Sequence, residues 1–421
     1  MARGARNGGS TWRGRHESRG KKARGGEPRR RNRFLPLKEE PAGYILDAAS
    51  LVLANNFKDM ADVADQLERY WPDKQPPATR ERCYDLVREA MRRGMFMVLP
   101  PVDFYQSRRL FREFCSKDGM HRSIKVVDAR HDAPVHVATG AAELLHWLVL
   151  KHAARRGSAE VHLGLGAGNS VLHVIEWLAG LLRTRALCPD FVVHACIASG
   201  LMKRTGQRGG AGQATTAMMA AQLRTAARQV ELIEVDWAAW VPADAHGQAR
   251  SEITSHRAFR LREAIDIIVV APAPAHRDSI FYDFVETDLP EDLEGTTRET
   301  LFSRGYIGDV MCQPFSESGP ILLDRGIRVL SLFEIDELVE FAARPEKDVV
   351  VLGGPCSGCG RMRTAALRPL IAEPTLRIWN HLVVDSTTAA ELLDSEGTSP
   401  RACCFEADNS PEVPPPVHRP R

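Results

Sequence analysis

The stretch Val161-His-Leu-Gly-Leu-Gly-Ala-Gly-Asn-Ser170 decides how the rest of the chain is interpreted. It begins as an apolar strand, passes through glycines at 164, 166 and 168, and ends in an apolar helical pattern. Glycines let backbone amides approach an anion closely, and the start of the next helix adds free N–H donors and a favourable dipole. The spacing of Gly164, Gly166 and Gly168 matches neither the dinucleotide fingerprint nor the P-loop. It predicts a site for the phosphate of a small molecule, or else a plain strand-to-helix turn. Two polar side chains at the helix start complete the candidate loop, Asn169 and Ser170.

Apolar runs that alternate with helical patterns surround this loop. Strands are expected at 124–127, 160–164, 191–195, 230–235, 265–270, 327–330, 349–352 and 381–384. Helices are expected at 141–151, 170–182, 215–228, 334–341, 364–371 and 387–393. This alternation indicates an α/β domain with a Rossmann-like, doubly wound and largely parallel sheet.

A second glycine pair, Gly353 and Gly354, also ends an apolar strand. Open parallel sheets bind ligands at the carboxyl ends of their strands, so the two glycine loops are expected to converge. Arg361 and Arg363 follow and are suited to a phosphate.

Other side chains of this half of the chain are less specific. Cys356 and Cys359 have CxxC spacing without a second pair or a histidine partner, which is weak support for zinc or redox chemistry, and no metal is expected. Asp309 follows a glycine at a strand entry, where it could accept hydrogen bonds from sugar hydroxyls or cap a turn.

Charge and cysteine usage bound the class of protein. Residues 1–33 carry a net charge of +10, so the rest of the chain carries −8 of the overall +2. This glycine- and arginine-rich arm has too few apolar residues to fold alone, and it suits either phosphate backbones or a solubilising role.

The sequence shows no secretory signal and no apolar run of about twenty residues, which predicts a cytoplasmic protein without membrane contact. The nine cysteines are expected to be reduced.

Three short helices are predicted after the arm. Helical spacing covers 44–55, Asp59 caps a second helix, and Thr79 caps a third that Gly94 ends, while the proline-rich stretch 71–77 forms a loop. The apolar run 95–99 is readable as a wing strand. This order is typical of a winged helix-turn-helix, and an ordinary three-helix capping domain is the alternative. The candidate DNA-binding residues are Thr79, Arg80, Arg82, Tyr84, Arg88 and Arg92.

Several segments, in order, resemble the SorC family of sugar-binding transcriptional regulators. The segment 163–170 resembles that family's Gly-Leu-Gly-Trp-Gly-Arg-Thr signature, and 307–310 resembles its Val-Gly-Asp stretch. The segments 315–319 and 349–355 resemble its Phe-Phe-x-x-x-Gly hairpin and its strand ending in Ala-Gly-Gly. The most specific match is 381–393, which resembles Val-Leu-Val-Thr-Asp-x-x-Thr-Ala-x-x-Leu-Leu.

The resemblance implies a domain related to sugar-phosphate isomerases and deaminases that senses an effector and has no catalytic residues. It implies a homodimer or homotetramer on double-stranded DNA, with a phosphorylated sugar as effector and no cofactor. By position, the glycine loop would take the phosphate, Asp309 the sugar hydroxyls, and Gln213 with Thr215 one side of the pocket.

Two departures from the family pattern concern the effector and the DNA. The family's lysine after the Gly-Gly pair is absent, and Arg361 is the candidate substitute. The loop 71–77 is longer than the usual turn before a recognition helix. The implied effector-binding residues are Gly164, Gly166, Gly168, Asn169, Ser170, Gln213, Thr215, Asp309, Gly353, Gly354 and Arg361.

The sequence therefore predicts five segments. They are a disordered basic arm at 1–40, a winged helix-turn-helix domain at 41–101, a linker helix at 102–120, an effector domain at 121–397 and a flexible tail at 398–421. The expected function is a DNA-binding transcriptional regulator gated by a phosphorylated sugar. Two alternatives remain open, an isomerase- or deaminase-like enzyme and a sensor that has lost DNA binding.

Overall fold

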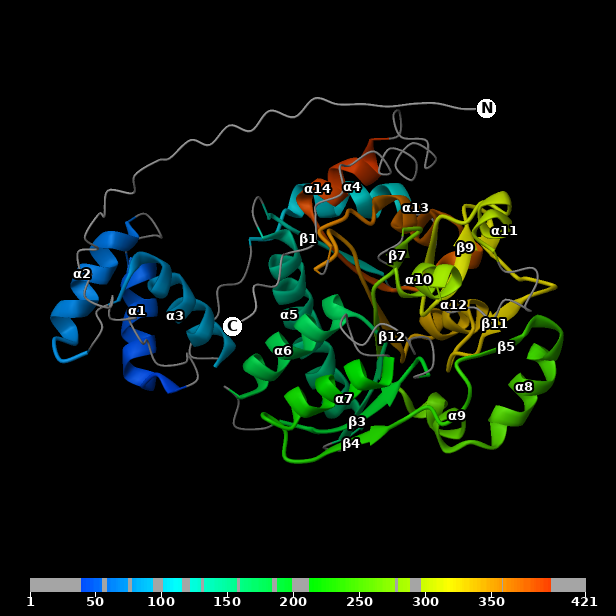
Figure 1. Cartoon of the computed structure of the whole chain (residues 1–421), viewed down its shortest axis with the longest axis horizontal. Helices are drawn as coiled ribbons and strands as arrows, with labels where there is room; N and C mark the ends of the chain where they lie inside the picture. Colours follow the sequence, from blue (N-terminus) through cyan, green and yellow to red (C-terminus); the bar gives the residue numbers. More distant parts are fainter. Residues whose placement is uncertain are drawn as a thin grey trace, which may run out of the picture. The chain divides into compact units, whose positions relative to one another are not determined.

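The structure is a computed structural model, and it divides the chain into two compact units, residues 1–87 and 88–421 (Figure 1). It describes residues 39–54, 59–74, 78–93, 101–115, 122–129, 132–156, 160–183, 188–198, 212–276, 279–287, 297–357 and 359–394. The predicted wing strand at 95–99, the arm at 1–38 and the tail from 395 lie outside these residues.

The first unit is built from the predicted helices. They are α1 (Ala42–Ala54), α2 (Met60–Tyr70) and α3 (Arg80–Arg92), whose last turns extend past residue 87. Asp59 caps α2, because its Oδ1 accepts hydrogen bonds from the amides of Ala61 and Asp62 at 3.0 and 3.1 Å. The Thr79 hydroxyl accepts one from the Arg82 amide at 3.2 Å. The apolar stripes of these helices are buried, with Ile45, Val63, Leu67, Cys83 and Leu86 at most 1% exposed.

The second unit is organised around a seven-stranded parallel sheet with the order β1-β13-β12-β6-β2-β3-β4. Each strand coincides with a run predicted from the sequence. The strands are β1 (Ser123–Val127), β2 (Glu160–Leu165), β3 (Asp190–Ala195), β4 (Val230–Ile233), β6 (Ile267–Val270), β12 (Asp348–Leu352) and β13 (His381–Asp385).

Successive residues of the strands pack into different apolar clusters on the two faces of the sheet. In β6, Ile267 and Val269 belong to one cluster and Ile268 and Val270 to the other. Strands that are buried on both faces need continuous apolar runs, which is why they could be recognised. The helices of the first face, grouped in Figure 1, are α5 (Ala133–Arg156), α6 (Asn169–Arg183) and α7 (Gly212–Leu223). Those of the second are α12 (Ile335–Ala343), α13 (Thr364–Ala372) and α14 (Ser386–Leu393).

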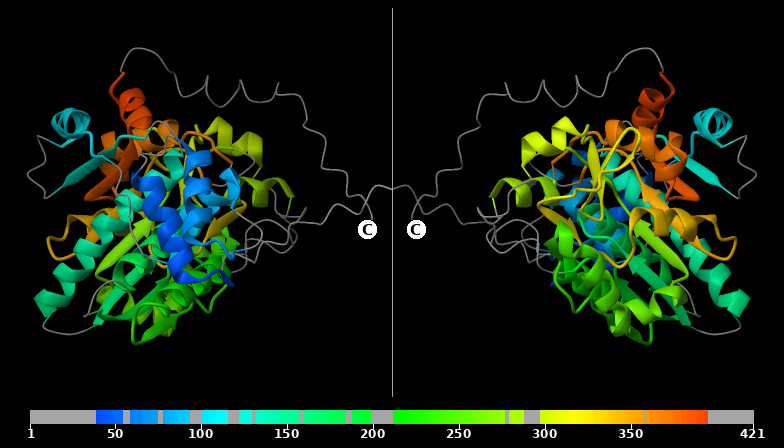
Figure 2. Two further views of the ribbon diagram at one scale, coloured as in Figure 1. Left: turned by 90° about the vertical axis from the view of Figure 1, so that its left-hand side faces the viewer. Right: turned by 90° about the vertical axis from the view of Figure 1, so that its right-hand side faces the viewer.

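Short elements between β4 and α12 form an extension of this unit, and their yellow part lies above α7 in Figures 1 and 2. They include a four-stranded antiparallel sheet of the order β10-β9-β8-β7. Its strands are β7 (Ala273–Pro274), β8 (Gly308–Val310), β9 (Gln313–Ser316) and β10 (Gly319–Pro320). The helices of the extension are α8 (His246–Glu252), α9 (Arg257–Leu261), α10 (Ile280–Thr287) and α11 (Arg298–Ser303).

One predicted strand belongs to this extension instead of the parallel sheet. The strand β11 (Ile327–Val329) pairs antiparallel with β5 (Trp240–Pro242). This strand has only two apolar residues, which flank Arg328. Only one side of the β5–β11 pair therefore packs into the core. The placement of 327–330 in the parallel sheet was therefore wrong.

The helix expected as a linker packs on the second unit. It is α4 (Phe104–Phe114), which Asp103 caps by accepting a hydrogen bond from the Gln106 amide at 2.9 Å. The amide of Asp103 donates to the Val126 carbonyl at 2.9 Å, and Leu110 is fully buried. The helix lies against β1 and α14. Among the described helices, none has the length and apolar character required to cross a membrane.

Candidate functional site

The glycine loop joins β2 to α6 at the carboxyl edge of the parallel sheet. The Gly166 amide donates to the Val269 carbonyl at 2.9 Å, which holds the loop against β6. A Cβ atom at Gly166 would lie 3.2 Å from the Val270 side chain, so the close approach of the two chains favours glycine. The first amides of α6 have no acceptor within the helix. They form a donor set of the kind that binds phosphate groups.

The backbone conformation at position 168 requires glycine, whereas packing does not. Its φ is +114°, and a Cβ atom there would meet nothing within 4 Å. Replacing Gly168 by alanine is expected to lower the free energy of unfolding by about 1–3 kcal/mol, because an L-residue is strained at this φ. Gly247→Ala, at another open position without a positive φ, is the matched control in urea denaturation, and equal effects would contradict the assignment.

Arg363 is the second component of the site. It precedes α13, is 6% exposed, and donates from Nη2 to the Ser170 hydroxyl at 2.9 Å. Its guanidinium also hydrogen-bonds Cys356, and burial lowers the pKa of Arg363. Ser357 completes the group, with its hydroxyl 3.2 Å from that of Ser170.

No carboxylate among the described residues pairs with this guanidinium, and its Nε is buried without an acceptor there. A buried cation is costly unless an anion compensates it. The glycine loop, the start of α6 and Arg363 therefore form one positively polarised site with the properties of an anion-binding site. The sequence had singled out Arg361 for this position. Arg361 instead contributes its backbone carbonyl, which accepts the Cys356 amide at 2.7 Å.

The Gly353–Gly354 pair lies at the carboxyl edge as expected, and packing explains both glycines. A Cβ atom at Gly353 would lie 2.5 Å from the Val384 side chain, and one at Gly354 would lie 2.7 Å from the Asp385 carboxylate. Gly354 also has a φ of +99°. The pair lets α13 and the end of β13 approach closely.

Asp309 is buried within the extension. Its Oδ2 accepts hydrogen bonds from the Ser279 hydroxyl at 2.8 Å and the Tyr306 hydroxyl at 3.1 Å, and the Cys312 amide also donates to the carboxylate. Cys312 and Met311 form the turn between β8 and β9 with φ values of +62° and +52°. Asp309 thus stabilises a strained turn, which is the structural alternative that the sequence left open.

Burial raises the pKa of Asp309 to about 6, against the hydrogen bonds from Ser279 and Tyr306. The native state then holds a proton that the unfolded chain has lost, so this residue reduces stability as pH rises from about 4 to about 6. Replacing Asp309 by asparagine is expected to raise the free energy of unfolding at pH 7 by about 2 kcal/mol and to remove this pH dependence. Chemical denaturation at pH 4 and pH 7 would measure it, and a lower stability of the variant at pH 7 would contradict the assignment.

The remaining predicted effector residues occupy different positions. Asn169 is exposed at the start of α6. Thr215 is buried in α7, which packs against α6 and β3. Gln213 is in the same helix, and its side chain lies outside the described residues. Nothing in the described geometry brings these two residues of α7 to Arg363.

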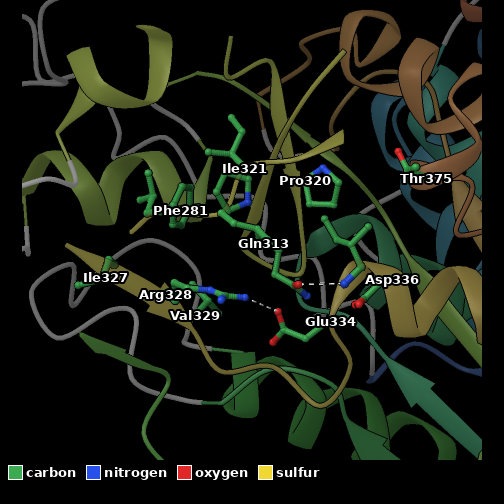
Figure 3. A pocket seen from close by; sticks show the side chains of 14 residues that line it. Phe281, Gln313, Pro320, Ile321, Ile327, Arg328, Val329, Glu334, Asp336 and Thr375 are labelled. Carbon is green, nitrogen blue, oxygen red and sulfur yellow. Dashed lines mark hydrogen bonds and ion pairs between the residues drawn. The ribbon is translucent and has the colours of Figure 1, made fainter. Parts of the chain in front are cut away.

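A pocket of about 280 Å³ lies in the extension (Figure 3). Its polar groups are engaged with one another. Arg328 pairs with Glu334 at 3.2 Å, and Oε1 of the Gln313 side chain accepts a hydrogen bond from the Ile335 amide at 3.1 Å. None of the residues of the glycine loop lines this pocket, so it is separate from the anion site.

A polar network lies at the opposite, amino edge of the sheet. The Asp348 carboxylate hydrogen-bonds Nε2 of His152 at 2.6 Å and Nε2 of His381 at 2.8 Å, and Lys151 lies 3.1 Å away. His152 also faces Asp266 at 3.6 Å. Burial raises the pKa of Asp348, but the hydrogen bonds from both histidines and the charge of Lys151 outweigh burial and hold that pKa well below its usual value. This network ties α5 to β12 and β13.

In the first unit, Arg82 is engaged internally. Its Nη2 lies 2.8 Å from Oε1 of Glu40, whose carboxylate also pairs with Lys74 at 2.6 Å. Because the Glu40 side chain is fully buried, losing Arg82 would leave part of its charge uncompensated. Arg82 therefore has a structural role in the first unit, and its contact with DNA stays a prediction.

The exposed side of α3 carries other predicted DNA contacts. Arg80, Tyr84 and Arg88 are exposed at intervals of four residues, so they share one stripe of the helix. Thr79 caps the helix, and the side chain of Arg92 lies outside the described residues. Three of the six predicted residues thus form one surface.

No family model and no curated protein sequence matches this chain. Solved structures of transcriptional regulators do match it. The full-length sorbitol operon regulator SorC from Klebsiella pneumoniae matches with a TM-score of 0.50 and 16% identity, over 84% of this chain and 100% of that one. A transcriptional regulator from Streptococcus pneumoniae TIGR4 also matches with a TM-score of 0.50, at 13% identity, over 70% of this chain and 98% of that one.

These similarities establish the fold. The chain has the α/β fold of these regulators, with N-terminal helices and a seven-stranded parallel sheet. In particular, it has the fold of full-length SorC. The resemblance to the SorC family and the fold class predicted from the sequence are confirmed at this level.

Proposed function

We propose that this protein is a DNA-binding transcriptional regulator whose α/β domain binds a phosphorylated sugar at the glycine loop. The observation that carries the proposal is the guanidinium of Arg363, which is buried beside Ser170 and has no carboxylate partner among the described residues. A phosphate monoester supplies the missing charge and accepts the first amides of α6. The fold shared with full-length SorC supports the coupling of this site to DNA binding.

Binding without turnover fits the chemistry of the site. An isomerase or deaminase requires an acid–base pair that reaches the substrate. Asp309 is the one carboxylate among the predicted effector residues, and it already accepts hydrogen bonds from Ser279, Tyr306 and the Cys312 amide. The effector domain is therefore proposed to shift between conformations on binding, and so to change the spacing of paired recognition helices in a homodimer or homotetramer.

A thermal-shift screen against sugar phosphates and their unphosphorylated parents tests the effector. A ligand that binds the native state raises the melting temperature by mass action. We expect at least one phosphorylated sugar to stabilise the protein while its parent does not. The phosphate site would be refuted if no phosphorylated sugar raised the melting temperature, or if the unphosphorylated parents raised it equally.

The DNA-binding surface requires a separate prediction. Replacing Arg80 and Arg88 together by alanine is expected to weaken binding of double-stranded DNA. The slope of log affinity against log salt concentration should become smaller by about two, which corresponds to two lost phosphate contacts. Arg257, an exposed arginine of α9 in the other unit, provides the control variant. Fluorescence anisotropy at several salt concentrations measures both. Unchanged affinity in the double variant would favour a sensor that has lost DNA binding.

A further inference from the structure

Cys356 and Cys359 lie in a closed turn beside the anion site. The Cys356 amide donates to the Arg361 carbonyl at 2.7 Å, and the Gly360 amide donates to the Cys356 carbonyl at 2.8 Å. Neither cysteine is in a disulfide, and Cys359 is exposed while Cys356 is half-buried. The Cys-x-x-Cys spacing is compatible with a disulfide, whose Cα atoms lie about 4.4–6.8 Å apart.

The guanidinium of Arg363 connects this pair to the anion site. It hydrogen-bonds the Cys356 side chain and the Ser170 hydroxyl, so the cysteine pair and the anion site share one buried positive charge. A neighbouring guanidinium favours the thiolate, which is the form that reacts with peroxides. Among the residues that the structure describes, no group of three or more His, Cys, Asp or Glu side chains could hold a metal. Two neighbouring cysteine side chains can together supply dithiol chemistry.

We propose that Cys356 and Cys359 form a peroxide-sensitive dithiol, whose oxidation to a disulfide strengthens phosphate binding at Arg363. The Cys356 thiolate attacks hydrogen peroxide, so that an S–O bond forms, the O–O bond breaks, and hydroxide leaves and is protonated to water. The Cys359 sulfur then attacks the sulfenic acid. The S–S bond forms, the S–O bond breaks, and the oxygen leaves with the thiol proton as a second water.

The coupling between the two sites follows from charge, and it rests on the proposed function. A thiolate at Cys356 and a phosphate compete for the same guanidinium, whereas a disulfide carries no charge. Oxidation therefore leaves the cation of Arg363 available to phosphate. Serine at position 356 would have the same effect permanently, because its hydroxyl is neutral and does not form a disulfide.

The first test follows oxidation of the full-length protein. After treatment with stoichiometric hydrogen peroxide, peptide mass spectrometry is expected to find the Cys356–Cys359 disulfide forming at least tenfold faster than oxidation of Cys188. Cys188 is a partly buried thiol on another part of the sheet and serves as the internal reference. In Cys359→Ser, dimedone should trap a sulfenic acid at Cys356, and Arg363→Gln should slow its formation. Oxidation of Cys356 no faster than that of Cys188 would overturn the dithiol.

The second test measures the affinity for inorganic phosphate by calorimetry. We expect the oxidised protein to bind about tenfold more tightly than the reduced protein, and Cys356→Ser to bind like the oxidised form with no response to peroxide. Equal affinities in the two redox states would overturn the coupling. If the disulfide forms and neither state binds phosphate or a sugar phosphate, the proposed effector site fails while the dithiol chemistry stands.

Discussion

Replacing Arg363 by glutamine is expected to weaken binding of the phosphorylated effector about a hundredfold. Hydrogen bonds to charged groups contribute about 1.5–3 kcal/mol, and 1.4 kcal/mol corresponds to a factor of ten in affinity. Without ligand, the same variant is expected to be as stable as the wild type or more stable, because a buried charge that no described carboxylate compensates is removed while glutamine can still donate to Ser170. Calorimetry with the effector found in the screen, and urea denaturation without it, measure the two effects.

Arg361 provides the matched control for this prediction. It has the same side chain and lies two residues earlier in the same turn, where its backbone carbonyl accepts the Cys356 amide. Arg361→Gln is expected to change effector affinity by less than threefold. A larger loss in Arg361→Gln than in Arg363→Gln would restore the assignment made from the sequence and refute the one made from the structure.

The second large effect is expected at the amino edge of the sheet. Replacing Asp348 by asparagine keeps the shape of the side chain but removes the counter-charge of Lys151 and weakens the hydrogen bonds to His152 and His381, and removing one partner of a buried ion pair costs about 3–5 kcal/mol. Asp324→Asn is the control, since that carboxylate is 88% exposed and its pair with Arg304 contributes about 1 kcal/mol or less.

The pH dependence of this effect has a definite sign. Because the pKa of Asp348 is lowered in the native state, its stabilisation is fully present above the pKa of about 3.9 in the unfolded chain and is lost as pH falls below that value. The difference in stability between the wild type and Asp348→Asn should therefore be constant near neutral pH and shrink below about pH 4. A difference that is unchanged at pH 3 would contradict this account.

The parallel sheet could be predicted because its strands carry their signal locally. Runs such as 267–270 and 349–352 are apolar on both faces, and 349–352 lies between the helical patterns at 334–341 and 364–371. The extension lacks this signal. Its strands β7 and β10 have two residues each, and α9 has five, so no periodicity can develop over their length.

The outline of the candidate site could be predicted from the sequence, whereas the arginine that binds the anion stays a prediction. The glycine loop can be recognised from its composition. Which of Arg361 and Arg363 faces that loop depends on the hydrogen bonds that close the turn between Cys356 and Arg361. The network at Asp348 was not predicted, because its members come from α5, β12 and β13. His152 and Asp348, for example, are about 200 residues apart in the chain. Pairing at that separation leaves no pattern in a single sequence.

The position of α4 has a practical consequence for work on isolated fragments. The strand β1 is at the border of the sheet, and α4 covers it through the Asp103 amide, the hydroxyl of Ser107 and the buried side chain of Leu110. A fragment beginning at residue 121 would expose this border, and open strand edges pair with other chains. A fragment beginning at residue 101 keeps the cover, and it is the starting point we expect to remain soluble at the concentrations that crystallisation requires.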